Sequence, residues 1–375
     1  MNLRAVEQIA KAVLYEGYML YPYRPSSVKN QQRWNFGVLC PRSYSEAQNG
    51  SEAWTMQTEC LVEGSLLTGL EVRVRFLQLI ARSVGELTTP LSDLLPVETP
   101  EFRQVDKLAV NDRVYQPWQE AVEREISVPL CNVEALGRSP ITQAFSFAAE
   151  KQFEPLRESD GKSGGESRGE SEGESEGMIV GILVRERNAI CGEVEVAGAR
   201  QDNGAFKVSV CIRNTTPFEI SNQTNREQAL LGALVSAHTV LGVQDGRFVS
   251  LLAPPEQMRE QAASCKNVGT WPVLVGEEGQ CDTVLSSPII LYDYPQIAPE
   301  SAGDLFDGTE IDEILSLRIM TLTDEEKREM SQSDERARQM LERTETMPVE
   351  QFMKLHGVLR GLRPLKPTSP QEETQ

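Results

Sequence analysis

The chain has 375 residues, enough for two ordinary domains, and 39% of them are hydrophobic and 25% charged, as expected of a globular protein. Its 56 acidic residues outnumber its 37 basic ones, for a formal net charge of −19, which argues against binding nucleic acid or anionic lipid. No apolar run has transmembrane length, and the first residues lack the apolar core of a signal peptide. We therefore expect a cytoplasmic protein without a membrane span.

The first elements are predicted to be a helix followed by strands. The opening apolar residues recur at helical spacing, namely Leu3, Val6, Ile9, Ala10, Val13 and Leu14, and Gly17 follows where the helix should end. Residues 54–62 and 70–76 then alternate apolar and polar side chains. This period of two predicts two half-buried antiparallel strands.

Between the helix and the first strand lies a run rich in tyrosine. It contains Tyr15, Tyr18, Tyr21 and Tyr23, which are four of the eight tyrosines in the chain, and it ends at Arg24. Rigid aromatic rings with a planar cation suit recognition of a partner. An aromatic seam in the core, where the helix joins the strand, explains the same residues, and the sequence leaves both interpretations open.

A Gly-Glu-Ser repeat divides the chain near its middle. Because it has no apolar residue to bury, we expect residues 158–177 to form a flexible linker or a loop inserted within one domain. The other predicted parts are an N-terminal α+β domain (1–157), a second α+β domain (178–308), C-terminal helices (309–363) and a disordered tail (364–375). The expected fold is α+β, with mainly antiparallel strands, a few packed helices, two lobes and a helical, acidic C-terminal region.

The second half of the chain is predicted to mix strands and helices. Residues 178–187, 206–213, 248–252 and 273–275 have strand patterns. Asn225 and Gln228 have the spacing of a helix cap, before a buried stripe that we expect to be helical: Leu230, Ala233, Leu234, Ala237 and Leu241. Two more capping patterns, Asp307 with Glu310 and Thr323 with Glu326, precede the C-terminal helices. Residues 299–350 carry 15 acidic and 6 basic residues.

The residues that usually carry catalysis are scarce. The two histidines, His238 and His356, stand far apart, which disfavours a histidine-based metal site or a catalytic triad. The seven cysteines form no C-x-x-C pair, so reduced thiols are expected. We predict no cofactor and no catalytic residue. A metal- or cofactor-handling protein that uses Cys265 and Cys281 with nearby carboxylates is the alternative, and a hydrolase with a carboxylate pair is a third hypothesis.

The run from Thr270 to Ser301 alternates Trp, Tyr, Pro, Gly and carboxylates. This density of large aromatic and turn residues is unusual for a core strand. Its Trp271, Tyr292, Asp293 and Tyr294 therefore join the N-terminal tyrosines and Arg24 as candidate partner-binding residues.

Residues 14–24 and 270–307 together resemble an uncharacterised bacterial family whose genes lie beside those of uptake nickel–iron hydrogenases. The likeness continues through residues 308–327, 341–345 and 353–357. It offers no reaction to transfer to any residue. What it implies is a non-catalytic accessory, assembly or maturation protein that acts by protein–protein interaction, with a hydrogenase subunit or maturation factor as its partner.

Overall fold

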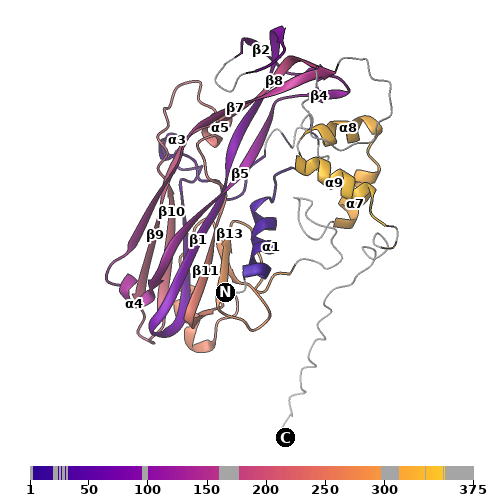
Figure 1. The fold of residues 1–375 in the computed structure, drawn as a ribbon. Helices are drawn as coiled ribbons and strands as arrows, with labels where there is room; N and C mark the ends of the chain where they lie inside the picture. The colour runs from indigo at the N-terminus through magenta and orange to yellow at the C-terminus, as the bar shows by residue number, and fades with distance from the viewer. Residues whose placement is uncertain are drawn as a thin grey trace.

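The computed structural model describes residues 3–19, 33–94, 100–159, 177–296, 312–333 and 335–348, together with residues 24, 27, 30 and 350. Figure 1 shows a long sheet that runs the height of the molecule, with helices α1, α7, α8 and α9 against one side of it. The α+β class with mainly antiparallel strands is confirmed. The helices are α1 (Leu3–Leu14), α3 (Arg42–Ala47), α4 (Val133–Leu136), α5 (Arg226–Leu230), α6 (Arg259–Ala263), α7 (Asp312–Met320), α8 (Asp324–Ser333) and α9 (Glu335–Glu345).

Eleven of the described strands belong to one sheet, and β3 (Leu108–Val110) pairs with β4 (Arg113–Tyr115) separately. The members of the large sheet are β1 (Thr55–Leu91), β2 (Phe102–Val105), β5 (Trp118–Asn132), β6 (Ile141–Phe147), β7 (Glu150–Ser159), β8 (Gly177–Arg187), β9 (Ile190–Arg200), β10 (Phe206–Asn214), β11 (Val235–Val249), β12 (Trp271–Leu274) and β13 (Thr283–Ser287).

Strand β1 organises the sheet, because its 37 residues pair antiparallel with β10, β11, β5, β8 and β2 in turn. The two strands expected at 54–62 and 70–76 are therefore parts of one strand, interrupted by a bulge between Gly64 and Gly69. Inside this bulge Thr68 Oγ1 donates to the carbonyl of Asp245 at 2.7 Å. A Cβ on Gly64 would lie 2.2 Å from Thr68 Oγ1, so a residue without a side chain permits the bulge.

The largest hydrophobic core lies where the sheet curls back on itself. Strands β1, β5, β9, β10 and β11 all contribute to it, and Val133 and Leu136 of α4 join the same cluster. Phe145 and Phe147 of β6, at the far end of the strand order, lie with their ring centroids 5.7 and 6.2 Å from that of Phe76 on β1. Strands that are distant along the sheet thus face each other across a single core.

The prediction of a long helix after Asn225 is mostly wrong. The cap itself forms, since Gln228 N donates to Asn225 Oδ1 at 2.9 Å and Asn225 N to Gln228 Oε1 at 3.1 Å. However, α5 ends at Leu230, and Val235 begins strand β11. The first nine residues of β11 are all buried. A strand covered on both faces has no period of two, so its apolar run resembles a buried helical stripe.

The Gly-Glu-Ser repeat lies between two strands that pair directly with each other. β7 and β8 are antiparallel, with Ser159 opposite Gly177. Strands from both sides of the repeat also belong to the same eleven-stranded sheet. This pairing favours the interpretation that the repeat interrupts one sheet over the interpretation that it joins two separate domains.

Both ends of the described chain pack together beside the sheet. Helix α1 is amphipathic as expected, and Gly17 beyond its end has a φ of +74°. The expected cap of α8 forms, because Glu326 N donates to Thr323 Oγ1 at 3.2 Å and Thr323 N donates to Glu326 Oε2 at 2.9 Å. A second core cluster joins eight described residues between Leu14 and Tyr44 to α7, α8 and α9. The pattern of Asp307 and Glu310 and the tail 364–375 lie outside the described residues.

Candidate functional site

The N-terminal tyrosines that the structure describes are interior residues. Tyr15 and Tyr18 are each 1% exposed. Tyr15 Oη donates to Glu123 Oε1 on β5 at 2.8 Å, and burial raises its pKa above the usual value. The guanidinium of Arg336 on α9 lies 4.1 Å from the centre of the Tyr15 ring. The two tyrosines thus form the aromatic seam that the sequence left open as one interpretation, and they connect α1, the sheet and α9.

Arg33 stands at the centre of this aromatic seam. Only 3% of it is exposed, and its guanidinium lies 3.6 Å from the ring centre of Trp118 and 4.8 Å from that of Trp34. It donates to the carbonyls of Tyr18 at 2.6 Å and Gln119 at 2.7 Å. A delocalised, weakly hydrated cation can be buried in this way. The seam is therefore a structural junction between the N-terminal segment and β5.

Of the remaining N-terminal candidates, one contacts the C-terminal helices and two lie outside the described residues. Arg24 pairs with Glu326 of α8 at 3.2 Å. Tyr21 and Tyr23 lie outside the described residues. The described part of the tyrosine run therefore holds the N-terminal segment against α8 and α9 and exposes no ring of Tyr15 or Tyr18.

By contrast, the candidates after Thr270 include large exposed side chains. Trp271 is 44% and Tyr292 85% exposed, and Ile290, between them in chain order, is 70% exposed. We call these three residues the β12 surface, because Trp271 begins β12, the last strand in the order of the large sheet. The sequence predicted two of these residues as candidates and missed Ile290.

Asp293 and Tyr294 hold the β12 surface in place. Asp293 Oδ1 accepts from Leu274 N at 2.8 Å, and its Oδ2 accepts from Ser250 Oγ at 2.5 Å. Tyr294 N donates to the carbonyl of Leu274 at 2.7 Å. Since β13 pairs with the opposite edge of β12, these bonds bring the segment with Ile290 and Tyr292 alongside β12. Asp293 and Tyr294 therefore act as supports of the surface.

The structure does not bring Cys265 and Cys281 together as a metal site. Cys265 packs against the cluster of Leu61, Ala205 and Met258, whereas Cys281 packs against the main core, with its Sγ 3.5 Å from Tyr294 Oη. Burial raises the pKa of the Cys265 thiol to about 11, which disfavours the thiolate that a metal would need. Within the described ranges, no three His, Cys, Asp or Glu side chains gather as a possible metal site.

His238 is fully buried, on strand β11 and not on the expected helix. Its Nδ1 lies 3.0 Å from the carbonyl of Ser236, and its Nε2 has no hydrogen-bond partner among the residues that the structure describes. Burial lowers the pKa of His238 to about 4, so the ring is neutral at physiological pH. It is therefore an interior residue of the sheet. His356 lies outside the described residues.

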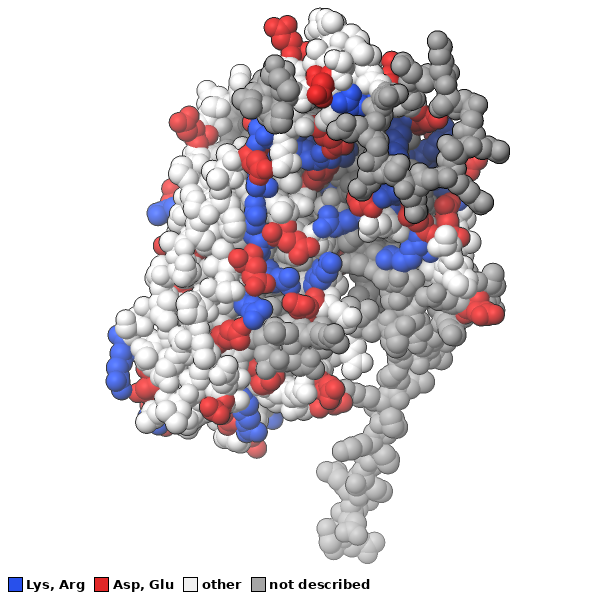
Figure 2. Space-filling view, viewed as in Figure 1, with Lys and Arg blue, Asp and Glu red and all other residues white. Residues whose placement is uncertain are grey.

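A second site, which the sequence did not predict, is a pocket of about 500 Å³ between the sheet and the C-terminal helices. Five arginines line it, namely Arg82, Arg113, Arg185, Arg328 and Arg338. We call it the arginine pocket. Figure 2 shows Lys and Arg side chains, interspersed with acidic ones, in this upper part of the molecule.

No protein-family model and no curated protein sequence matches this chain. Among the described residues, none of the helices is long and apolar enough to cross a membrane. The two surfaces that remain as candidates for function are the β12 surface and the arginine pocket.

The two sites differ in how far the sequence reveals them. The β12 surface comes from one continuous run, so its unusual composition is visible locally. The arginine pocket collects side chains from β1, β4, β8, α8 and α9, and no local spacing relates Arg82 to Arg338. Its only sequence signal is the presence of arginine in strands and helices, which ordinary ion pairs explain equally well.

Proposed function

We propose that this protein is a non-catalytic accessory or assembly protein that binds another protein through the β12 surface. The observation that supports this proposal is the exposure of Trp271, Ile290 and Tyr292 beside the last strand of the sheet. Large aromatic residues that pack into pockets of a partner contribute most of the binding energy at many protein interfaces.

The support beneath these side chains strengthens the proposal. Asp293 ties the segment to β12 and to Ser250 by hydrogen bonds, so the anchor residues extend from a fixed backbone. A fixed surface loses little conformational entropy on binding.

The partner is proposed from the sequence resemblance. It is a subunit or a maturation factor of a nickel–iron hydrogenase, met in the cytoplasm. The acidic residues of the C-terminal region would influence the rate of association and the choice of partner, because charges outside the interface core mainly steer the encounter.

Co-purification from the native host tests both parts of the proposal. The tagged full-length protein should retain a hydrogenase subunit or maturation factor, identified by mass spectrometry. The double variant Trp271→Ala, Tyr292→Ser should lose most of it, by about tenfold or more if both are anchor residues. A matched control is Leu67→Ser, since Leu67 is 80% exposed in the β1 bulge, and this variant should bind as the wild type does.

Two results would count against this function. Either the wild-type protein retains no hydrogenase component, or the double variant retains it as well as the Leu67→Ser control does. Thermal melting of all variants shows whether a loss reflects the surface or the fold. Deleting the gene should also lower hydrogen uptake by the cells.

A further inference from the structure

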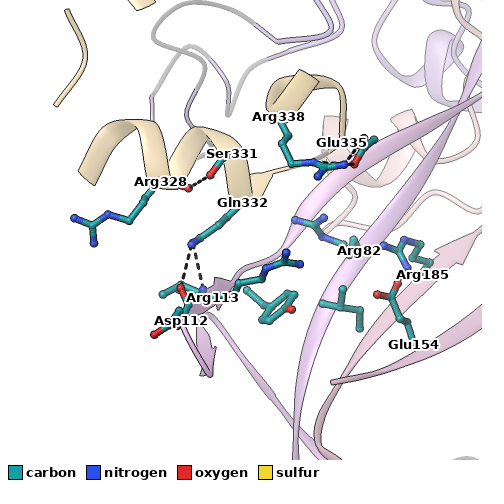
Figure 3. A pocket seen from close by; sticks show the side chains of 13 residues that line it. Arg82, Asp112, Arg113, Glu154, Arg185, Arg328, Ser331, Gln332, Glu335 and Arg338 are labelled. Atoms are coloured by element: carbon teal, nitrogen blue, oxygen red, sulfur yellow. Dashed lines mark hydrogen bonds and ion pairs between the residues drawn. The ribbon is translucent and has the colours of Figure 1, made fainter. Parts of the chain in front are cut away.

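The arginine pocket has two walls that are already joined. The sheet side contains Arg82 of β1, Arg185 of β8 and the β3–β4 hairpin, and the helix side contains residues of α8 and α9. The backbone N–H of Val114 on β4 donates to Gln332 Oε1 on α8 at 3.2 Å. Figure 3 shows Gln332 reaching the hairpin next to Asp112. This hydrogen bond therefore joins the two walls of the pocket directly.

Arginine is concentrated in the lining of this pocket, in a chain whose net charge is −19. Five arginines line it beside three carboxylates, those of Asp112, Glu154 and Glu335. Two more carboxylates, Glu120 and Glu342, pair with lining arginines from outside the lining. An anion is therefore favoured where a guanidinium group of the lining has no carboxylate of its own.

The arginines differ in how far neighbouring carboxylates neutralise them. Arg82 and Arg185 share Glu120, at 3.0 and 2.7 Å. Arg338 pairs with Glu335 on its own helix at 2.5 Å. The side chain of Arg113 forms no ion pair and no hydrogen bond within the described part of the chain. Its guanidinium keeps all of its donors available.

Arg82 adds a fixed positive charge beside the same cavity. It is 7% exposed, and its terminal nitrogens bind Glu120 and the carbonyl of Gln116. Its Nε is buried and has no hydrogen-bond partner among the described residues. Arg82 therefore acts on a ligand in the pocket through its charge.

Figure 3 shows how these groups are directed. The guanidinium groups of Arg82 and Arg113 lie towards each other, and that of Arg338 points towards the same space from α9 above them. Arg328 is directed away from this group. Planar guanidinium forks at such a site match the paired oxygens of phosphate or carboxylate.

The rest of the lining suits the organic part of a small molecule. Val114, Tyr115 and Leu183 contribute apolar surface to the pocket. A volume of about 500 Å³ is within the range of ligand pockets, which is roughly 300–1,000 Å³.

We propose that the arginine pocket binds a small oxyanion, a molecule that carries phosphate or carboxylate groups. Arg113 holds its charged group, and the positive charges of Arg82 on the sheet side and Arg338 on the helix side add to the attraction. Because the pocket lies between the sheet and α8–α9, the bound anion stabilises the contact between them. This inference does not depend on the proposed function, since it concerns a different surface.

Thermal melting of the full-length protein tests this site with defined ions. Phosphate, pyrophosphate, citrate and sulfate are each compared with chloride at equal ionic strength, and the affinity of the most stabilising ion is measured by calorimetry. Phosphate, pyrophosphate or citrate should raise the Tm above its value in chloride. A response to the phosphate ions alone assigns phosphate chemistry to the site, and a response to citrate alone assigns carboxylate chemistry.

Two variants locate the effect. Arg113→Glu should weaken binding by about tenfold or more, because a charge-assisted hydrogen bond is replaced by repulsion. Arg138→Glu is the matched control, since Arg138 is 80% exposed on its side chain, just past α4, and it should bind as the wild type does. In hydrogen exchange, the ion should slow exchange in α8 and α9 of the wild type but not of Arg113→Glu.

The proposal is overturned if none of these ions raises the Tm above that in chloride. It is equally overturned if Arg113→Glu and Arg138→Glu respond as the wild type does, since the ion would then act elsewhere.

Discussion

The aromatic seam around Arg33 and the arginine pocket use the same cation in opposite ways. Both lie where the sheet meets elements from an end of the chain. In the seam, the guanidinium of Arg33 is 3% exposed, stacked on Trp118 and hydrogen-bonded to two carbonyls. In the pocket, Arg113 is exposed and has no ion pair within the described residues. The neighbours of an arginine thus decide whether it fastens the fold or remains available to a ligand.

The largest effect on the free energy of unfolding should come from replacing Arg33, the arginine of the aromatic seam. Arg33→Met leaves the carbonyls of Tyr18 and Gln119 without their donor and removes the cation from the Trp118 ring. We expect a loss of about 4 kcal/mol in the free energy of unfolding, measured by urea denaturation. Arg33→Lys should fall between this variant and the wild type, because it keeps the charge and loses the planar stack. A loss below about 1 kcal/mol in Arg33→Met would show that the seam does not depend on its cation.

The next largest effect on the free energy of unfolding should come from His238, which is buried and neutral. His238 lies near Arg75 and Glu123, and burial lowers its pKa to about 4 in the folded protein, whereas the unfolded chain titrates near 6.5. The unfolded state therefore takes up the proton first. The contribution of His238 to the free energy of unfolding is fully present above pH 6.5. It is lost as the pH falls towards 4, by about 3 kcal/mol in total.

The measurement is the difference in unfolding free energy between the wild type and His238→Leu across this pH range. Leu has a similar volume and does not titrate, so the variant should become relatively more stable as the pH falls. Parallel curves for the two proteins would mean that His238 keeps an ordinary pKa.

A smaller effect is expected at the helix wall of the pocket. Thr323→Ala removes the side chain that accepts from Glu326 N at the start of α8. The free energy of unfolding should fall by about 1 kcal/mol, and hydrogen exchange should accelerate first in α8. Thr321→Ala is a nearby control, since Thr321 accepts no capping N–H and donates only to the carbonyl of Arg318. Equal losses in both variants would argue against a specific role of the cap.

The smallest effect on stability is expected at Arg113. Arg113→Ala should change the free energy of unfolding by no more than about 0.5 kcal/mol, because no partner is left unpaired. The same variant should reduce anion binding. Chemical denaturation in chloride, followed by the same experiment in the stabilising ion, separates the two properties. A large loss in chloride alone would show that Arg113 fastens the fold as Arg33 does.

Much of the local structure could be predicted from neighbouring residues. The apolar stripe of α1, the cap of Thr323 and Glu326, and strands β8 and β10 were predicted from spacing alone. Each depends on contacts within one element or on one exposed face. Strand β11 could not be predicted from spacing, because burial on both faces removes the alternation by which a strand is recognised.

The sequence by itself determined these local elements, the charge balance and the unusual run that contains Trp271 and Tyr292. Only the tertiary structure decided that β1 is one long strand, that Tyr15 and Tyr18 are interior, and that Arg82, Arg113 and Arg338 line one pocket. Those outcomes depend on residues far apart in the chain meeting as the sheet curls and α9 packs beside it, as Tyr15 meets Arg336. Spacing along the chain carries no record of such contacts, because burial and charge pairing are set by which surfaces come together.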